Sequence, residues 1–251
     1  MIYQYLPKKI SSVLWGNRDK YGFIPDFSDD DWKIWLEKGY SDFYQTTQLK
    51  GLGSWVNRLS LSVISKVNFK DTTVLEIGPG MIRHLSYMNA KPNKYIICDH
   101  DQHCLEMSAD ILKKNIITFE AELLKDNFQL PFKDSVFDII ISFNSLEHLH
   151  PLDDYLQEMK RVMKKDGFLV GGMPCEGGLA WGLGRYFTTR RYVHKNYGIN
   201  YDKIICWEHP NFADFIFKHL GTFFIMSYKK YHPFRYLPMD CNLVASFIYQ
   251  K

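Results

Sequence analysis

The chain is predicted to fold as an α/β protein with a doubly wound, mostly parallel sheet. From about residue 72 onward, short runs rich in β-branched residues alternate with helical patterns, which is the arrangement that βαβ units produce. The first of these runs ends in a Gly-x-Gly turn, "VLEIGPG" at 74–80. The last two apolar runs are separated only by turn residues, so they predict an antiparallel hairpin at the end of the sheet.

Strands and one clear helix account for the region between 72 and 174. Strands are expected at 72–78, 94–98, 115–120, 136–143 and 167–173, with the hairpin strands near 222–229 and 241–249. Before the fifth strand, Leu152, Leu156 and Met159 recur at the spacing of one helix face. Basic residues are concentrated near the C-terminal end of that helix, where the helix dipole favours positive charge, and Gly167 is expected to end it.

The other segments are expected to form a helical cap and a lid. Residues 1–70 contain helical patterns at 29–51 and 54–67, with a Gly-Leu-Gly break between them, and are assigned to an N-terminal helical cap. Residues 71–251 form the sheet domain. Within it, residues 175–210 follow the fifth strand and are rich in Gly, aromatic residues and Arg, and a stretch of this length usually forms a functional loop or lid.

Composition and charge narrow the function classes. The net charge of +3 is too small to indicate a nucleic-acid partner. The five cysteines are odd in number and show no CxxC pair, which favours free thiols in a reducing compartment. No apolar run has the length of a membrane span or a signal sequence, so the expected location is cytoplasmic. The sequence does not indicate an oligomeric state.

The glycine turn predicts a nucleoside ligand without phosphates. Gly78 and Gly80 let the backbone approach a ligand closely, and Asp99 ends the next strand, where an acid can accept both ribose hydroxyl protons. The dinucleotide fingerprint requires a third glycine, but that place holds Arg83, and Pro79 removes a backbone N–H from the turn. Both features count against a pyrophosphate cradle. A helix is expected to start directly after this turn.

Four motifs in order carry a resemblance to a known family. They are "VLEIGPG", "YIICDHD", "LPFKDSVFDIIISFNSLEH" at 130–148 and "LQEMKRVMKKDGFLVGGMP" at 156–174. In this order and spacing, across residues 72–174, the chain resembles the class I S-adenosylmethionine-dependent methyltransferases. The resemblance implies a Rossmann-like, seven-stranded sheet with a reversed last strand. It also implies S-adenosylmethionine as the cofactor and S-adenosylhomocysteine as its product.

The resemblance also implies which residues hold the cofactor. The turn would lie beside the methionine moiety, Asp99 would bind the ribose, and an acid after the third strand would lie near the adenine amine. Glu122 is assigned to that last place, with Asp126 as the alternative. The full set of implied cofactor residues is Glu76, Gly78, Pro79, Gly80, Asp99, Glu122, Phe143 and Asn144.

The stretch "FNSLEHLHP" after the fourth strand supplies the candidate catalytic residues. His148 is a candidate base for the acceptor proton, and Glu147 would orient it or the substrate. The alternative is a capping box, in which Asn144 and Glu147 cap a helix about one turn long. A related metal-binding run, E-x-x-E-H, has a carboxylate where this chain has Asn144, so no metal is predicted.

The predicted lid supplies the candidate substrate residues. Arg185, Arg190 and Arg191 are expected to bind phosphate or carboxylate oxygens, and His209 belongs to a second Glu-His pair. The alternative is a solvated basic helix packed on its aromatic face. The pieces "PCEGG" and "EHPN" are similar to a branch of these methyltransferases that accompanies bacterial surface-glycan synthesis.

The hypothesis that combines these features is O-methylation of a small, anionic, sugar-related acceptor. The alternatives are methylation of RNA or of a quinone-like molecule, and a methyltransferase-like protein that binds the cofactor without turnover.

Overall fold

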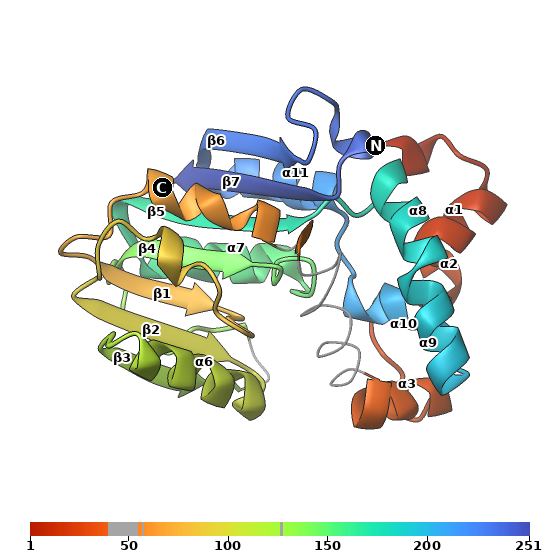
Figure 1. The fold of residues 1–251 in the computed structure, drawn as a ribbon, viewed down its shortest axis with the longest axis horizontal. Coiled ribbons are helices and arrows are strands. Elements are labelled where there is room, and N and C mark those ends of the chain that lie inside the picture. The colour runs from red at the N-terminus through yellow and green to blue at the C-terminus, as the bar shows by residue number, and fades with distance from the viewer. Residues whose placement is uncertain (40–54, 57, 126–127) are drawn as a thin grey trace. The chain divides into compact units, whose positions relative to one another are not determined.

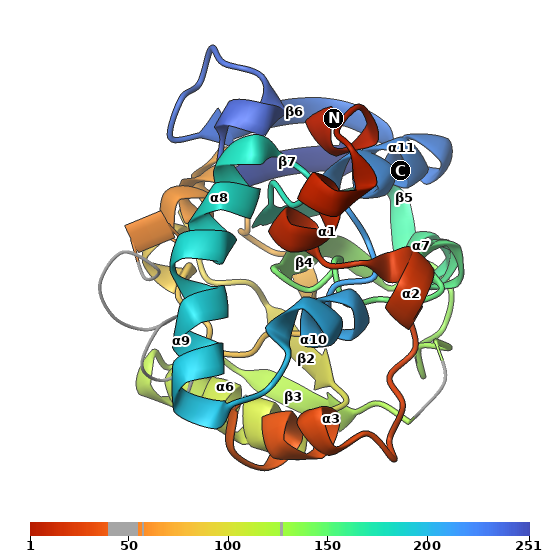
Figure 2. The ribbon, with the colours of Figure 1, turned by 90° about the vertical axis from the view of Figure 1, so that its right-hand side faces the viewer.

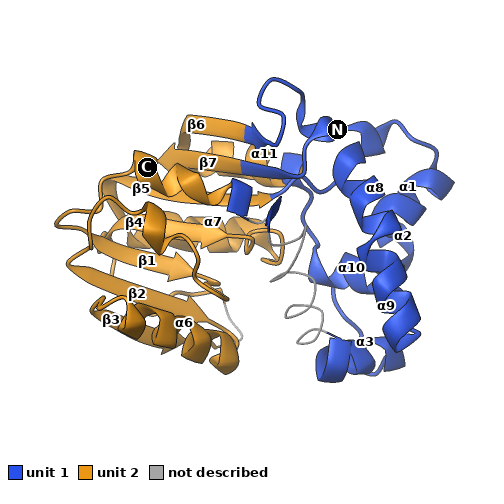
Figure 3. Cartoon of the chain, viewed as in Figure 1, with its two compact units in different colours: residues 1–59, 174–214, 231–245 blue, residues 60–173, 215–230, 246–251 orange. Residues whose placement is uncertain are grey.

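The computed structural model describes residues 1–39, 55–56, 58–125 and 128–251. The chain forms two compact units, shown in separate colours in Figure 3. Unit 1 comprises Met1–Leu59, Pro174–Asp214 and Tyr231–Ala245, and unit 2 comprises Ser60–Met173, Phe215–Lys230 and Ser246–Lys251. The predicted division at residue 70 remains a prediction, and the predicted Gly-Leu-Gly break at 51–53 and Asp126 lie outside the described residues.

A seven-stranded sheet has the order β3-β2-β1-β4-β5-β7-β6, which confirms the predicted fold class (Figure 1). Neighbouring strands from β3 through β5 pair in parallel, and β7 runs in the opposite direction. The strands are β1 (Thr73–Ile77), β2 (Lys94–Asp99), β3 (Phe119–Leu123), β4 (Phe137–Phe143), β5 (Met163–Pro174), β6 (Ile225–His232) and β7 (Val244–Gln250).

Within the described residues, the α-helices that belong wholly or mainly to unit 2 are α6 (Gln102–Lys114), α7 (Leu152–Val162) and α11 (Ala213–Phe223). The side chains of Val74, Ile139 and Ile141 belong to an apolar cluster on one face of the sheet. Leu105 and Leu112 of α6 complete that cluster. The helices α7 and α11 meet each other through Asp153 and His219. The helix α6 thus covers one face of the sheet.

Several predicted boundaries are wrong for local reasons. The helix before β5 ends at Val162, and β5 begins at once, so Gly167 lies inside the strand and does not end the helix. Lys164 faces Asp138 of β4 and pairs with it at 2.9 Å. The third strand begins at Phe119 and not at residue 115, because α6 continues to Lys114.

No α-helix follows the glycine turn, contrary to the prediction. Within residues 78–93, which the structure describes throughout, the only helical element is a single 3-10 turn, Leu85–Tyr87. The segment between Gly80 and this turn has no regular hydrogen-bond ladder. The His84 side chain, at the end of this segment, holds it to Tyr95.

The helices of unit 1 come from two segments that are far apart in the sequence, the N-terminal residues and residues 174–214. They are α1 (Lys8–Trp15), α2 (Arg18–Tyr21), α3 (Asp30–Ile34), α8 (Leu179–Phe187), α9 (Thr189–Tyr197) and α10 (Tyr201–Glu208). The helices α8 and α9 follow each other end to end (Figure 2). Trp32, Trp35, Val193, Ile204 and Trp207 belong to its apolar core. The predicted lid is thus largely helical, and it packs with N-terminal residues of the same unit.

None of the helices in the described ranges is long and apolar enough to cross a membrane.

Candidate functional site

The glycine turn lies at the carboxyl end of β1, and it requires glycine at two positions. Gly78 has φ +62°, and a Cβ atom there would lie 2.7 Å from Cβ of Ser145. Gly80 also has a positive φ, 50°. These are backbone conformations that glycine adopts at little cost. The turn therefore runs close to the loop after β4, and the Ser145 side chain packs against Gly78.

Further hydrogen bonds hold the turn to its neighbours in unit 2. The Gly78 N–H donates to the carbonyl of Cys98 at 2.9 Å, and the Ser108 hydroxyl of α6 donates to the carbonyl of Gly80 at 2.7 Å. Asp99, which is predicted to bind the ribose, directly follows Cys98 at the end of β2. The hydrogen bond from Gly78 to Cys98 therefore connects the turn to the residue next to Asp99. Burial raises the pKa of the Asp99 carboxyl, while the backbone N–H of Asp101 opposes that shift.

Glu76 is a buried residue, 2% exposed, and its carboxylate is directed into unit 2. The Tyr95 hydroxyl donates to its Oε2 at 2.6 Å, and Nε2 of His84 lies 3.1 Å from the same hydroxyl. Burial raises the pKa of Glu76 to about 8, although the bond from Tyr95 opposes this. Glu76 is therefore placed at the turn as predicted, but its side chain is occupied inside the fold.

Glu122 is exposed on the edge strand β3, in register with Cys98 of β2. It therefore lies one residue from the carboxyl end of its strand, while Asp99 lies at the carboxyl end of the neighbouring strand. This placement leaves the assignment of Glu122 to the adenine amine as a proposal.

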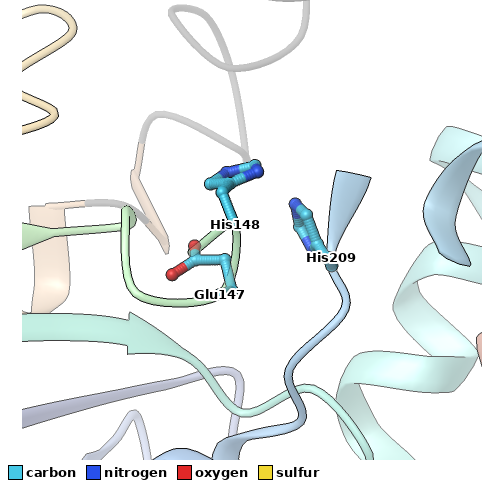
Figure 4. Close-up of side chains that lie close together, drawn as sticks. All are labelled: Glu147, His148 and His209. Atoms are coloured by element: carbon cyan, nitrogen blue, oxygen red, sulfur yellow. The ribbon is translucent and has the colours of Figure 1, made fainter. Parts of the chain in front are cut away.

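The residues after β4 form turns and not a helix, so the capping-box alternative is wrong. Asn144 has φ +50° and donates its backbone N–H to the carbonyl of Gly172 at 2.8 Å, and no helix begins there. The His148 N–H donates to the Ser145 carbonyl at 3.0 Å, which closes a single turn. Figure 4 shows the side chains of Glu147 and His148 on this loop. Glu147 is buried and His148 is exposed.

The arginines of unit 1 that are predicted to bind the substrate differ in their burial and in their partners. Arg185 is 4% exposed, and it donates to the carbonyls of Leu14 and Val13 and to Asp202. Arg190 makes a bidentate pair with the same Asp202 carboxylate, at 2.8–2.9 Å. These contacts explain Arg185 as a residue that joins α8 to α1 and α10. Its predicted part in substrate binding stays untested.

Arg191 is exposed and lies over the rings of Tyr186 and Phe187, 5.9 and 5.0 Å from their centroids. Arg190 lines a cavity of about 460 Å³ in unit 1, which Asp31, His194, Asn200 and Tyr201 also line. The cavity carries charges of both signs. Of the three predicted arginines, Arg191 is the most exposed and contacts aromatic rings, whereas its two neighbours are paired with a carboxylate.

Glu176, which the sequence analysis did not single out, orients His209 within unit 1. Glu176 is fully buried, and its Oε2 lies 2.5 Å from Nδ1 of His209, which follows α10. Arg18 donates to the other carboxylate oxygen at 3.0 Å and to the His209 carbonyl at 2.7 Å. A carboxylate bonded to Nδ1 fixes the tautomer and the orientation of an imidazole. The signal in the sequence was the pair of pieces "PCEGG" and "EHPN", which contain Glu176 and His209.

The residues at the turn fit a nucleoside cofactor without phosphates. Gly78 and Gly80 give the turn its positive-φ backbone at the end of β1, and an acidic residue, Asp99, ends the neighbouring strand. A carboxylate suits hydroxyl donors and repels phosphate.

Comparison with known proteins finds similarity over part of the chain. Residues 75–171 match the family described as a methyltransferase domain. An uncharacterized protein of Methanocaldococcus jannaschii is 30% identical over 112 residues, 45% of each chain. A mitochondrial arginine-hydroxylase of Homo sapiens is 27% identical over 100 residues, 39% of this chain and 28% of that one. The chain thus spans less than half the length of each of these curated relatives.

Solved structures share the fold. A SAM-dependent methyltransferase from Aquifex aeolicus superimposes with a TM-score of 0.53 at 15% identity, over 88% of this chain and 98% of that one. At this identity the likeness establishes the fold alone.

Proposed function

We propose that this chain, a member of the class I S-adenosylmethionine-dependent methyltransferase family, transfers a methyl group to a hydroxyl of a small, anionic, sugar-related acceptor. The observation that carries the proposal is the turn at Gly78 and Gly80 beside Asp99, within the residues that match the methyltransferase domain. We assign cofactor binding to the turn of unit 2.

Asp99 and the turn supply the proposed cofactor contacts. S-adenosylmethionine supplies a methyl group on a sulfonium sulfur, which makes that methyl reactive toward an oxygen nucleophile. The Asp99 carboxylate accepts the ribose hydroxyl protons, and the open turn admits the methionine end. Phe143, at the end of β4, supplies an aromatic surface beside the turn. Such a site acts mainly by positioning.

The acceptor hydroxyl must lose one proton, and His148 is the proposed proton acceptor. It lies on the loop after β4 with an exposed imidazole, and histidine is the side chain that exchanges protons near neutral pH. His209 is a second candidate, because Glu176 holds its Nδ1 as carboxylates do in catalytic histidine pairs. Replacing each with Gln separates the candidates: the proton acceptor is the one whose variant loses turnover while S-adenosylmethionine still binds.

An anionic acceptor is proposed from the basic residues of unit 1. Asp202 is shared by two guanidiniums, so the cluster of Arg185, Arg190 and Asp202 carries a net positive charge. Arg191 adds an exposed guanidinium stacked on aromatic rings, which suits a phosphate or carboxylate.

The test is a release assay for S-adenosylhomocysteine with nucleotide sugars, phosphorylated sugars, RNA and quinone analogues. Turnover with a phosphorylated sugar supports the proposal, and Arg191→Ala should then raise the KM for that acceptor about tenfold with kcat unchanged. Turnover with RNA or a quinone alone would contradict the acceptor class. Binding of S-adenosylmethionine with no turnover across the panel would favour a protein that uses the fold without methyl transfer. A hydroxylase among the relatives makes that outcome worth measuring.

A further inference from the structure

We propose that His84, Tyr95 and Glu76 form a buried anchor that positions the cofactor-binding turn, and that these side chains act on the turn without touching the cofactor. The inference rests on the proposed placement of the cofactor at Gly78 and Gly80. It assigns a role to His84 and Tyr95, which the proposed function leaves without one.

The turn needs an anchor because it has no helix behind it. A helix after the turn would fix each residue through hydrogen bonds to the residue four positions before it. Here residues 81–84 precede a single 3-10 turn, Leu85–Tyr87, and carry no such ladder. Ser108 holds the carbonyl of Gly80 at one end of the segment. His84 lies at the other end.

His84 ties that end of the segment to three strands. Its Nε2 lies 3.1 Å from the hydroxyl of Tyr95 on β2, and that hydroxyl donates to Glu76 on β1 at 2.6 Å. Its ring stacks on Phe143 of β4, with 5.4 Å between centroids and 29° between planes. One imidazole therefore connects the segment to β1, β2 and β4, and Glu76 lies two residues before Gly78.

Two arrangements of the hydrogen atoms fit these contacts. In one, the Tyr95 hydroxyl donates to Glu76 Oε2 and its oxygen accepts the N–H of His84 Nε2; in the other, a protonated Glu76 donates to Tyr95, whose hydroxyl donates to Nε2. In both, the other ring nitrogen, Nδ1, lies 3.7 Å from Glu76, beyond hydrogen-bond range. Burial lowers the pKa of His84 to about 3 and raises that of Glu76 to about 8, so both are neutral at pH 7.

Burial is the reason that the anchor is assigned a positioning role. His84, Tyr95 and Glu76 are 1%, 0% and 2% exposed. Tyr95 belongs to the apolar cluster on one face of the sheet, together with Val74 and Ile97 of β1 and β2. A hydrogen-bonded chain in such surroundings holds its side chains in place, because breaking one of its bonds leaves a buried polar group unpaired.

Calorimetric titration with S-adenosylhomocysteine, together with amide hydrogen exchange of the ligand-free protein, tests the anchor. Tyr95→Phe removes one hydroxyl and no other atom, and we expect about tenfold weaker binding and faster exchange at residues 81–87. His84→Gln keeps a donor at the place of Nε2 and should bind within about threefold of wild type. His84→Met fills the volume without a donor and should match Tyr95→Phe.

Ile139→Val is the matched control, because it loses one methylene from the same apolar cluster on β4, two strands away from Tyr95. It should bind as wild type does. The proposal is overturned if Tyr95→Phe keeps wild-type binding and exchange, or if Ile139→Val reproduces its losses. Hydrogen exchange is measured without ligand, so it tests the anchor even if the wild-type chain binds no S-adenosylhomocysteine. A lack of binding by the wild-type chain would count against the proposed function and not against the anchor.

Discussion

Unit 2 buries Glu76, Tyr95 and His84 as a neutral hydrogen-bonded chain, whereas unit 1 buries ion pairs. In unit 2, Glu76 and His84 are both shifted by burial to their uncharged forms. In unit 1, Glu176 pairs with Arg18, and Arg185 pairs with Asp202. A neutral network carries no charges for salt to screen, and it stays neutral only between the pKa values of its members. A buried ion pair fixes geometry strongly, but it is costly to break, since the remaining charge has no partner.

The largest effect is expected on removing a buried charge from unit 1. Arg185→Met leaves the carbonyls of Val13 and Leu14 without their donor and removes one partner of Asp202. We expect a loss of about 3–5 kcal/mol in the free energy of unfolding, measured by urea denaturation. Arg191→Met, an exposed arginine on the next helix, is the control and should change stability by less than about 0.5 kcal/mol. Equal stability of the two variants would show that Arg185 is not a structural residue.

In unit 2, the anchor predicts an asymmetric dependence of stability on pH. Glu76 has a raised pKa of about 8, so its proton stabilises the folded state, and that contribution is lost as pH rises toward 8 and above. From pH 6.5 to 9 we expect a loss of about 2 kcal/mol from this group. His84 has a lowered pKa of about 3, so its contribution is lost as the pH falls from about 6.5 toward 3. Between about pH 4.5 and 6.5 the two slopes oppose each other and cancel.

Thermal unfolding of Glu76→Gln checks the sign of this prediction. The variant has no carboxyl at this position, so its stability should fall less between pH 6.5 and 9 than that of the wild type. A steeper fall in the variant would contradict the assignment of a protonated Glu76 at neutral pH.

The smallest effect is expected on removing divalent cations. The loop after β4 offers Asn144 where a related metal-binding run has a carboxylate, and an amide is a weaker ligand for a hard cation. Treatment with a chelator, followed by gel filtration, should leave methyl transfer unchanged. A loss of turnover that Mg²⁺ or Mn²⁺ restores would show that the chain uses a metal.

The sheet of unit 2 could be predicted because hydrophobic pattern and motif agree there. The runs that end at Ile77, Cys98 and Phe143 are apolar and β-branched, and all three are strands close to their predicted bounds. The prediction of a helix after Gly80 was wrong. Sequence alone does not reveal that His84 is drawn into the core by Tyr95, eleven residues farther along the chain.

Unit 1 was less predictable because its contacts join distant parts of the chain. Arg18 and Glu176 are 158 positions apart, and Arg185 bonds to residues 171 and 172 positions away. Three neighbouring arginines therefore look equivalent in the sequence. Only the fold shows that Arg185 is buried, that Arg190 is paired and that Arg191 is exposed.

Calorimetric titration of S-adenosylmethionine into the wild-type chain and into Asp99→Ala tests the central claim most directly. Asp99 ends β2 beside the glycine turn, and we assign to it both ribose hydroxyls. We expect saturable binding to the wild type and an affinity at least about a hundredfold weaker in the variant, because two hydrogen bonds to a charged group are lost. Equal affinity in the two proteins, or tight binding of NADH with no response to S-adenosylmethionine, would contradict the account.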